Sequence, residues 1–222
     1  MSESRMYSYI CETPEVLRNI ICNRKEITEQ FTAYAKDKDI QQIYVLGSGT
    51  SYHAGLSAKN YLEELLGMKV FCMYPTQFER SEKVFNKHTL VIGMSQGGQS
   101  LSTVAGLDAA RKQGLYTAAV SENPSALIFE HADTRTLIQV GNEQCGAKTK
   151  GYAGTTVTLM MMLTELALEK GIVSKEKAEA YFERMYRVID NLGNVTKAAV
   201  EWYGRIRDEF LPAKRIIVVG YD

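Results

Sequence analysis

The sequence predicts an α/β protein in which a parallel sheet is covered by helices on both faces. Short apolar and β-branched runs, of which 43–46 is the first, alternate along the chain with longer segments of helical periodicity. Two of these runs end in glycine- and serine-rich turns, at 47–51 and 95–100. The 222 residues are enough for one such domain with a substantial core, and few for two complete ones. We therefore expect a three-layer, doubly wound sheet.

Two amphipathic helices are expected ahead of the first strand. Thr13 and Pro14 have the order of an N-cap followed by a first helical residue, and apolar residues at helical spacing come after them. A second helix is expected at 26–35, where Ile27 and Phe31 lie on one face. Two short amphipathic helices have no core of their own, so both should cover another element.

The first strand, 43–46, leads through a tight turn into a long helix that Gly67 ends. Four apolar or β-favouring residues in a row suit a strand that is buried on both faces. The turn at 47–51 carries two glycines and three hydroxyl side chains to the start of the helix. Because a helix N-terminus has unpaired N–H groups and a partial positive charge, this turn is a candidate anion site.

Four more strands are expected along the chain, at 69–74, 89–94, 115–120 and 134–140. Pro75 stops the first of them, and the turn at 95–100 leads the second into a helix that Gly114 ends. A short helix is expected at 126–131. Alternating strands and helices predict five parallel strands, with ligands bound outside their carboxyl ends.

After a polar loop that begins at Gly141, the sequence predicts additional C-terminal helices at about 155–168, 175–190 and 195–210. The segment 215–220 then repeats the pattern of 42–47, so a second copy of the unit is expected to begin there. A sixth strand that joins the first sheet is the alternative. The expected organisation is N-terminal helices in 1–40, a first domain in 41–195, and the helix and first strand of a truncated second domain in 196–222.

The composition argues against several classes of function. Lysine plus arginine equals aspartate plus glutamate, at 26 each, and no basic block offers a nucleic-acid surface. The N-terminus is polar, and Thr164 and Glu165 interrupt the most apolar helix, so we expect a cytoplasmic protein without a membrane span. Scattered cysteines and histidines predict no metal site. Tyr52 occupies the place of the third glycine in a dinucleotide fingerprint, and no cofactor is expected.

Three loops that follow strands are expected to meet at one end of the sheet: 47–51, 95–100 and 143–150. They supply hydroxyls, side-chain amides and open backbone N–H groups. Neutral donors in such number match a polyhydroxylated anion, that is a sugar phosphate, better than a magnesium triphosphate. Two serine-rich capping turns without a ligand are the alternative interpretation.

Three segments, 47–54, 94–100 and 143–150, together resemble the sugar isomerase (SIS) domain. The likeness is to the first of the two such domains in the isomerase half of glutamine:fructose-6-phosphate amidotransferase, and to relatives without a glutaminase domain. It implies a flavodoxin-like sheet and a small-molecule sugar phosphate as ligand. The positions that the resemblance implies for substrate binding are Gly49, Thr50, Ser51, Ser95, Gln96, Gly97, Ser100, Gly146 and Lys148.

Two departures from the family pattern concern the substrate. The amidotransferase loop usually reads Ser-Gln-Ser-Gly-Glu-Thr, whereas here Gly97 lacks a hydroxyl and Gln99 replaces the acid. Lys148 stands where the family commonly has serine, and it adds a positive charge near the sugar. The identity of the sugar therefore stays open.

The resemblance implies an enzyme, either a phosphosugar isomerase or a deglycase or deaminase of phosphorylated amino sugars. The family places its catalytic groups in the second domain, so the base stays unassigned, with Glu143 a weak candidate. A module that senses a sugar phosphate without turning it over is the alternative function. The apolar helices after 155 also predict a homo-oligomer.

Overall fold

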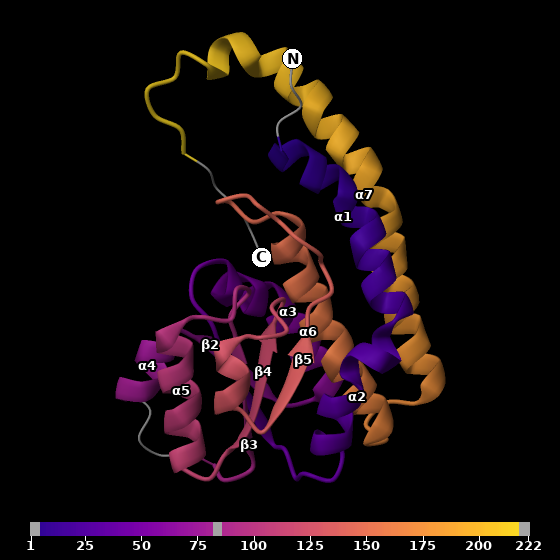
Figure 1. Ribbon diagram of the computed structural model, residues 1–222. Coiled ribbons are helices and arrows are strands. Elements are labelled where there is room, and N and C mark those ends of the chain that lie inside the picture. Colours follow the sequence, from indigo (N-terminus) through magenta and orange to yellow (C-terminus); the bar gives the residue numbers. More distant parts are fainter. Residues whose placement is uncertain (1–4, 82–85, 218–222) are drawn as a thin grey trace.

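The computed structural model describes residues 5–81 and 86–217 of the chain. It contains a five-stranded sheet in which every neighbouring pair is parallel (Figure 1). The strands are β1 (Gln42–Leu46), β2 (Lys69–Met73), β3 (Thr89–Met94), β4 (Tyr116–Ser121) and β5 (Thr134–Leu137). Their order across the sheet is β2-β1-β3-β4-β5, so the predicted flavodoxin-like, doubly wound sheet is confirmed.

Helices cover both faces of the sheet, as expected for three layers (Figure 1). On one face lie α2 (Arg24–Ala35), α3 (Thr50–Leu66) and α6 (Lys150–Glu169). On the other lie α4 (Pro75–Ser81), α5 (Leu101–Lys112) and the short 3₁₀ helix η1 (Leu127–His131). Outside the first layer, α1 (Arg5–Cys22) and α7 (Lys175–Phe210) pack side by side and against α6.

The central strands are buried from both sides. In β1, Ile43 and Val45 join the core beneath α3 and α6, whereas Tyr44 and Leu46 join the core with α4 and α5. All six residues of β3 are buried. Side chains that alternate between two apolar layers explain why these strands are continuous apolar runs in the sequence.

The crossover direction reverses between β1 and β3. The helix after β1, α3, lies on the face with α6, and the helix after β3, α5, lies on the opposite face. Because β1 and β3 are neighbours, the turns that follow them open away from each other at the same edge of the sheet. This topological switch point is the usual ligand crevice of an open α/β sheet.

The start of α1 was predicted wrongly. The helix begins at Arg5 rather than at Thr13, and Pro14 lies inside it. Proline supplies no N–H to the preceding turn, while the Thr13 hydroxyl donates to the carbonyl of Tyr9 at 2.9 Å. Packing of α1 along α6 and α7 stabilises the longer helix, and a local capping pattern does not reveal that packing.

The C-terminal helices also differ from the prediction. The segments expected at 175–190 and 195–210 form the single 36-residue helix α7, which Gly193 does not interrupt. One glycine in a helix costs roughly 1 kcal/mol relative to alanine, too little to break a long amphipathic helix. Of the strand expected at 215–220, residues 215–217 are not in a strand, and 218–220 lie outside the described residues.

Smaller differences occur at other strand ends. Pro75 ends β2 as predicted, and it also begins α4, which the sequence analysis missed. β5 ends at Leu137 rather than at residue 140. The N–H of Ile138 donates to the Ser121 carbonyl at 2.8 Å, so the chain stays against β4 beyond the strand.

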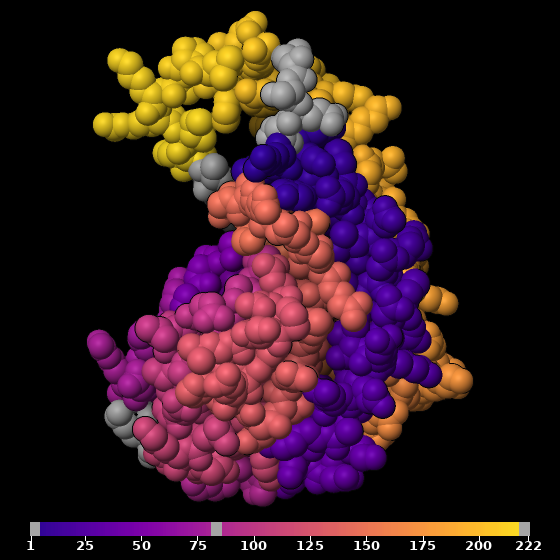
Figure 2. Space-filling model, in the orientation of Figure 1, coloured from indigo at the N-terminus to yellow at the C-terminus, as the bar shows by residue number. Residues whose placement is uncertain are grey.

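The C-terminal part of α7 projects beyond the body of the molecule (Figure 2). Several of its large apolar side chains are exposed, namely Val195, Val200, Trp202, Tyr203 and Phe210. Large apolar side chains that stay exposed along one helix are often part of an interaction surface. In the part of the chain that the structure describes, no helix is both long and apolar enough to cross a membrane.

Arg24 connects three helices behind the sheet. Its guanidinium donates to Glu165 of α6 at 2.8 Å and to Glu179 of α7 at 3.0 Å, and it lies 4.4 Å from the ring centre of Phe182. The side chain of Glu165 is only 6% exposed. Burial raises the pKa of Glu165, and the neighbouring Arg24 opposes that shift.

Arg24→Met should lower the free energy of unfolding by about 3 kcal/mol, because Glu165 would stay buried without its cation. Arg18→Met is the matched control, since the Arg18–Asp190 pair is about half exposed and should contribute less than about 1 kcal/mol. Urea unfolding followed by circular dichroism measures both. Equal losses in the two variants would contradict the stabilising role of Arg24.

Candidate functional site

The turn between β1 and α3 presents unused hydroxyls at a helix N-terminus. Gly49 is the N-cap of α3, with φ 56°, and Thr50 begins the helix. Ser48 and Thr50 are exposed, and Ser51 is buried. Within the described part of the chain, these three hydroxyls have no hydrogen-bond partner. They are therefore available to a ligand.

The turn between β3 and α5 is tighter. The Gly98 N–H donates to the Ser95 carbonyl at 3.0 Å, and Gly98 has φ 75°. A Cβ at Gly98 would lie 2.2 Å from the Cβ of Ala126, so only glycine fits this turn. The Ser95 hydroxyl has no hydrogen-bond partner among the described residues, whereas a Cβ at Gly97 would meet open space.

Ser100 has a structural contact in addition to its predicted binding role. It is the N-cap of α5, and its hydroxyl oxygen accepts from the Thr103 N–H at 3.4 Å and from the Thr103 hydroxyl at 3.0 Å. The N–H groups of Leu101 and Ser102 precede the first intrahelical bonds and point out of the helix end. This end of α5 is suited to an anion.

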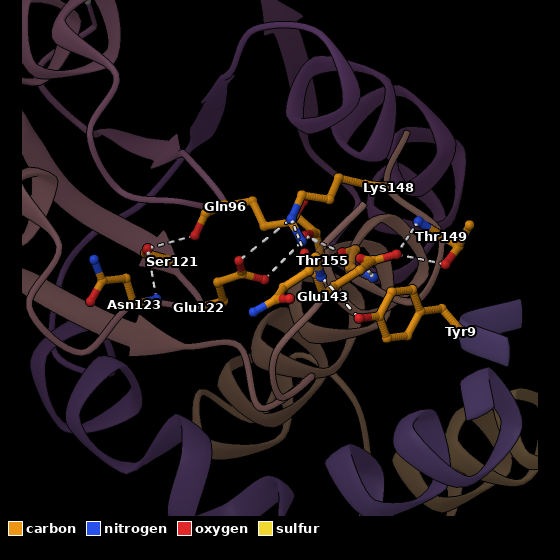
Figure 3. A network of polar contacts seen from close by, with 11 residues as sticks. Tyr9, Gln96, Ser121, Glu122, Asn123, Glu143, Lys148, Thr149 and Thr155 are labelled. Carbon is orange, nitrogen blue, oxygen red and sulfur yellow. Dashed lines mark hydrogen bonds and ion pairs between the residues drawn. The ribbon is translucent and has the colours of Figure 1, made fainter. Parts of the chain in front are cut away.

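Gln96 links the second turn to the end of β4 (Figure 3). Its backbone carbonyl accepts from the Ser121 hydroxyl at 2.9 Å and from the Glu122 N–H at 3.0 Å. Its side-chain amide donates to Glu122 Oε2 at 2.8 Å. Glu122 thus lies beside the predicted binding residues, although it was not itself predicted to belong to the site.

Glu143 fixes the third loop to the start of α6. Its Oε1 accepts from the Thr149 N–H at 2.7 Å and from the Thr149 hydroxyl at 2.6 Å, and its Oε2 accepts from the Gly151 N–H at 2.9 Å. Burial raises the pKa of this carboxyl. The hydrogen bonds from Thr149 and Gly151 lower it by more than burial raises it, so the pKa of Glu143 lies below its usual value. Both oxygens hold backbone or neighbouring side-chain donors, which suits an anchor better than a base.

Lys148 extends from this loop over the end of the sheet (Figure 3). Its ammonium donates to the Glu143 carbonyl at 3.0 Å and lies 3.8 Å from Glu122 Oε1. Gly146, two residues before it, is exposed, and a Cβ there would meet open space. Lys148 and Gln96, both predicted from the sequence, therefore converge on Glu122.

The loop is also held to α1. The buried ammonium of Lys150 donates to Glu12 at 2.8 Å and lies 4.8 Å from the ring centre of Tyr9. The Tyr9 hydroxyl accepts from the Gln144 N–H at 3.0 Å. The hydrogen bond from Lys150 is the main reason that the pKa of Glu12 lies below its usual value. Sequence reasoning missed these contacts, because they join residues far apart in the chain.

Gly151 brings the second and third loops together. A Cβ at this position would lie 1.7 Å from the Gln96 amide nitrogen and 2.7 Å from Glu143 Oε2. Any larger residue would push both side chains away. The close approach of these loops at Gly151 was not predicted.

Metal ligation finds no support in the described residues, which contain no cluster of three His, Cys, Asp or Glu side chains. A cavity of about 430 Å³ lies between α1, α3, α6 and α7, lined mainly by apolar and aromatic side chains such as Tyr61, Met160 and Met185. None of the predicted site residues lines it. The candidate site is the group of loops that follow β1, β3 and β4 at the carboxyl ends of these strands.

A family model described as the SIS domain matches residues 38–168, more than half of the chain. The chain belongs to the SIS domain family. The match begins just before β1 and ends in α6, so it includes all three loops of the candidate site.

The curated relatives are longer proteins. A glutamine–fructose-6-phosphate aminotransferase (isomerizing) of Clostridium tetani is 31% identical over 191 residues, which are 83% of this chain and 31% of that protein. The protein of the same name from Gloeobacter violaceus is 28% identical, over 82% of this chain and 30% of its own length. The chain thus spans about a third of the length of these relatives.

Solved structures share the fold. A candidate phosphosugar isomerase from Clostridium difficile 630 is 36% identical with a TM-score of 0.83, over 90% of this chain and 56% of that one. A candidate sugar-binding protein from Salmonella typhimurium LT2 is 28% identical with a TM-score of 0.77, over 90% and 61%. The C-terminal domain of glucosamine-fructose-6-phosphate aminotransferase from Francisella tularensis, at 21% identity and a TM-score of 0.70 over 93% and 57%, has the same fold.

Glu143→Gln should lower the free energy of unfolding by about 1–3 kcal/mol at neutral pH, because an amide oxygen is a weaker acceptor than a carboxylate and the second oxygen becomes an NH₂ group. The folded-state pKa of Glu143 is depressed, so its stabilisation is present above the usual value of 4.5 and is lost as the pH falls through the lower, folded-state pKa. Urea unfolding across this range should show the two proteins converging below pH 4.5.

The control is Glu130→Gln, at an exposed glutamate in η1, which should leave stability unchanged at every pH. A stability gap for Glu143→Gln that persists undiminished at about pH 3 would show that ionisation of Glu143 is not what stabilises the loop.

Proposed function

We propose that this chain binds a phosphorylated six-carbon sugar or amino sugar and belongs to an enzyme of the phosphosugar isomerase or deglycase type. The observation that carries the proposal is the pair of turns at the switch point between β1 and β3. Each turn begins a helix, and the hydroxyls of Thr50, Ser51 and Ser95 have no hydrogen-bond partner in the described residues. Family membership and the Clostridium difficile neighbour support the same ligand class.

The phosphate is assigned to the turn between β3 and α5. Its open backbone N–H groups, the helix end and the Ser95 hydroxyl offer neutral donors to a dianion. The sugar hydroxyls are assigned to the turn at Gly49 to Ser51. Gly97 and Gly146 leave room for the ligand because neither carries a side chain.

The proposed reaction exchanges a proton between the first and second carbons of an open-chain sugar, or releases an amine from one of them. It requires ring opening, a base, and stabilisation of an enediolate or enamine. Glu143 is a poor base here, since both of its oxygens accept hydrogen bonds and its pKa is lowered. We therefore assign binding to these 222 residues and leave the base unassigned.

Ser95→Ala should weaken binding of fructose 6-phosphate roughly ten- to a hundredfold, because one hydrogen bond to a charged group is lost. Isothermal titration calorimetry measures the change, and Ser125→Ala, at an exposed serine after β4, is the matched control. If neither Ser95→Ala nor Thr50→Ala alters the affinity, both turns are only helix caps and the proposed function fails.

The 222-residue chain should bind the sugar phosphate without exchanging the proton next to its carbonyl. General acid and base groups contribute about 10²–10⁴-fold each, and they act together, so a chain without them should not exceed the uncatalysed rate. NMR in heavy water follows the exchange. Exchange above the uncatalysed rate would place a working base in this chain, and variants of Glu122 and Glu143 would then identify it.

A further inference from the structure

The Lys148 ammonium and the Glu122 carboxylate form an ion pair without a direct hydrogen bond. The ammonium and Glu122 Oε1 are 3.8 Å apart, beyond hydrogen-bond distance, and the two side chains are 26% and 21% exposed. Within the described residues, Glu122 Oε1 accepts no hydrogen bond, and the ammonium donates one, to the Glu143 carbonyl. In this partly buried position, Glu122 Oε1 can therefore accept a further hydrogen bond and the Lys148 ammonium can donate one.

Both charges are held in place by neighbours in the binding loops. The Gln96 amide fixes the other oxygen of Glu122 at 2.8 Å. The Glu143 carbonyl fixes the ammonium, and the three hydrogen bonds to the Glu143 carboxylate fix that loop in turn. Each charge therefore has a second contact within the binding loops, which holds the two groups on either side of a short gap.

A hydroxyl group matches this spacing best. It can donate to Glu122 Oε1 and accept from the Lys148 ammonium at the same time. An ammonium on the ligand would be attracted by Glu122 but repelled by Lys148 at a similar distance. A carboxylate would be attracted by Lys148 but repelled by Glu122. A partly exposed ion pair adds little to stability, so a purely structural role gives no reason for two charges here.

We propose that Glu122 and Lys148 form a paired-charge subsite that binds a sugar hydroxyl and disfavours an ammonium at that position. This inference rests on the proposed function, because it places the end of the sugar away from the phosphate between the two charges. Gln96 connects the subsite to the turn that is assigned to the phosphate. The preferred ligand is therefore the phosphate of a sugar without an amino group rather than an amino sugar phosphate.

The test compares glucose 6-phosphate with glucosamine 6-phosphate, which differ only in a hydroxyl or an ammonium on the second carbon. Titration calorimetry at a pH where the amine is protonated should show tighter binding of glucose 6-phosphate. In Lys148→Met, Glu122 loses its cation, so glucose 6-phosphate should bind about tenfold more weakly and glucosamine 6-phosphate more tightly. In Glu122→Gln, the unpaired ammonium should increase the preference for glucose 6-phosphate.

The two variants thus shift the ligand preference in opposite directions, which a loss of folding cannot imitate. Lys59→Met, which removes an α3 lysine paired with Glu63 at 4.0 Å, is the charge control and should leave the preference unchanged. Circular dichroism melting checks that each variant is folded. Lys148→Ser, which removes more of the side chain, should reproduce the direction seen with Lys148→Met.

Equal changes for both ligands, or shifts in the same direction in both variants, would overturn the subsite while leaving the proposed function intact. Absence of binding by either ligand and by fructose 6-phosphate would instead overturn the proposed function, and the subsite with it. A wild-type preference for glucosamine 6-phosphate would also overturn the subsite.

Discussion

The reversal of crossover direction between β1 and β3 is the constraint on which the candidate site depends. Parallel strands place all their carboxyl ends at one edge, and the reversal sends α3 and α5 to opposite faces of the sheet. Two helix N-termini therefore lie at the same edge of the sheet, on opposite faces. Any sequence with this topology gains a place for an anion, and the side chains on the turns decide which anion it is.

The third loop depends on a second constraint, the crowding at Gly151. The Gln96 amide and the Glu143 carboxylate both approach this residue so closely that a Cβ would overlap them. Glu143 in turn holds Thr149 and supplies the carbonyl that orients Lys148. A substitution at any of these positions should displace the side chains at the others, so the second and third loops act as one unit.

Most of the fold could be predicted from the sequence, because the patterns that mark its strands, turns and helix ends are local. The bounds of β3 were predicted without error, and Gly67 ends α3 as expected. The turns that carry Thr50 and Ser95 could be placed because strand, glycine and helix signals follow one another there. The start of α1 and the continuity of α7 could not be predicted, since packing between helices overrides the signals of Pro14 and Gly193. Glu122 was missed for a related reason: its importance comes from neighbours on other loops.

Hydrogen bonding divides the polar groups of these loops into two sets. Glu143 and the Ser121 hydroxyl have their partners within the protein, and they hold the loops in shape. The Thr50 and Ser95 hydroxyls and one oxygen of Glu122 have none among the described residues, although Ser95 and Glu122 are largely shielded from solvent. None of these three oxygens is fully buried, so water can still reach them in the free protein. Under the proposed function, a sugar phosphate replaces this water and completes the same hydrogen bonds. The division therefore separates the residues proposed to face the ligand from those that support them.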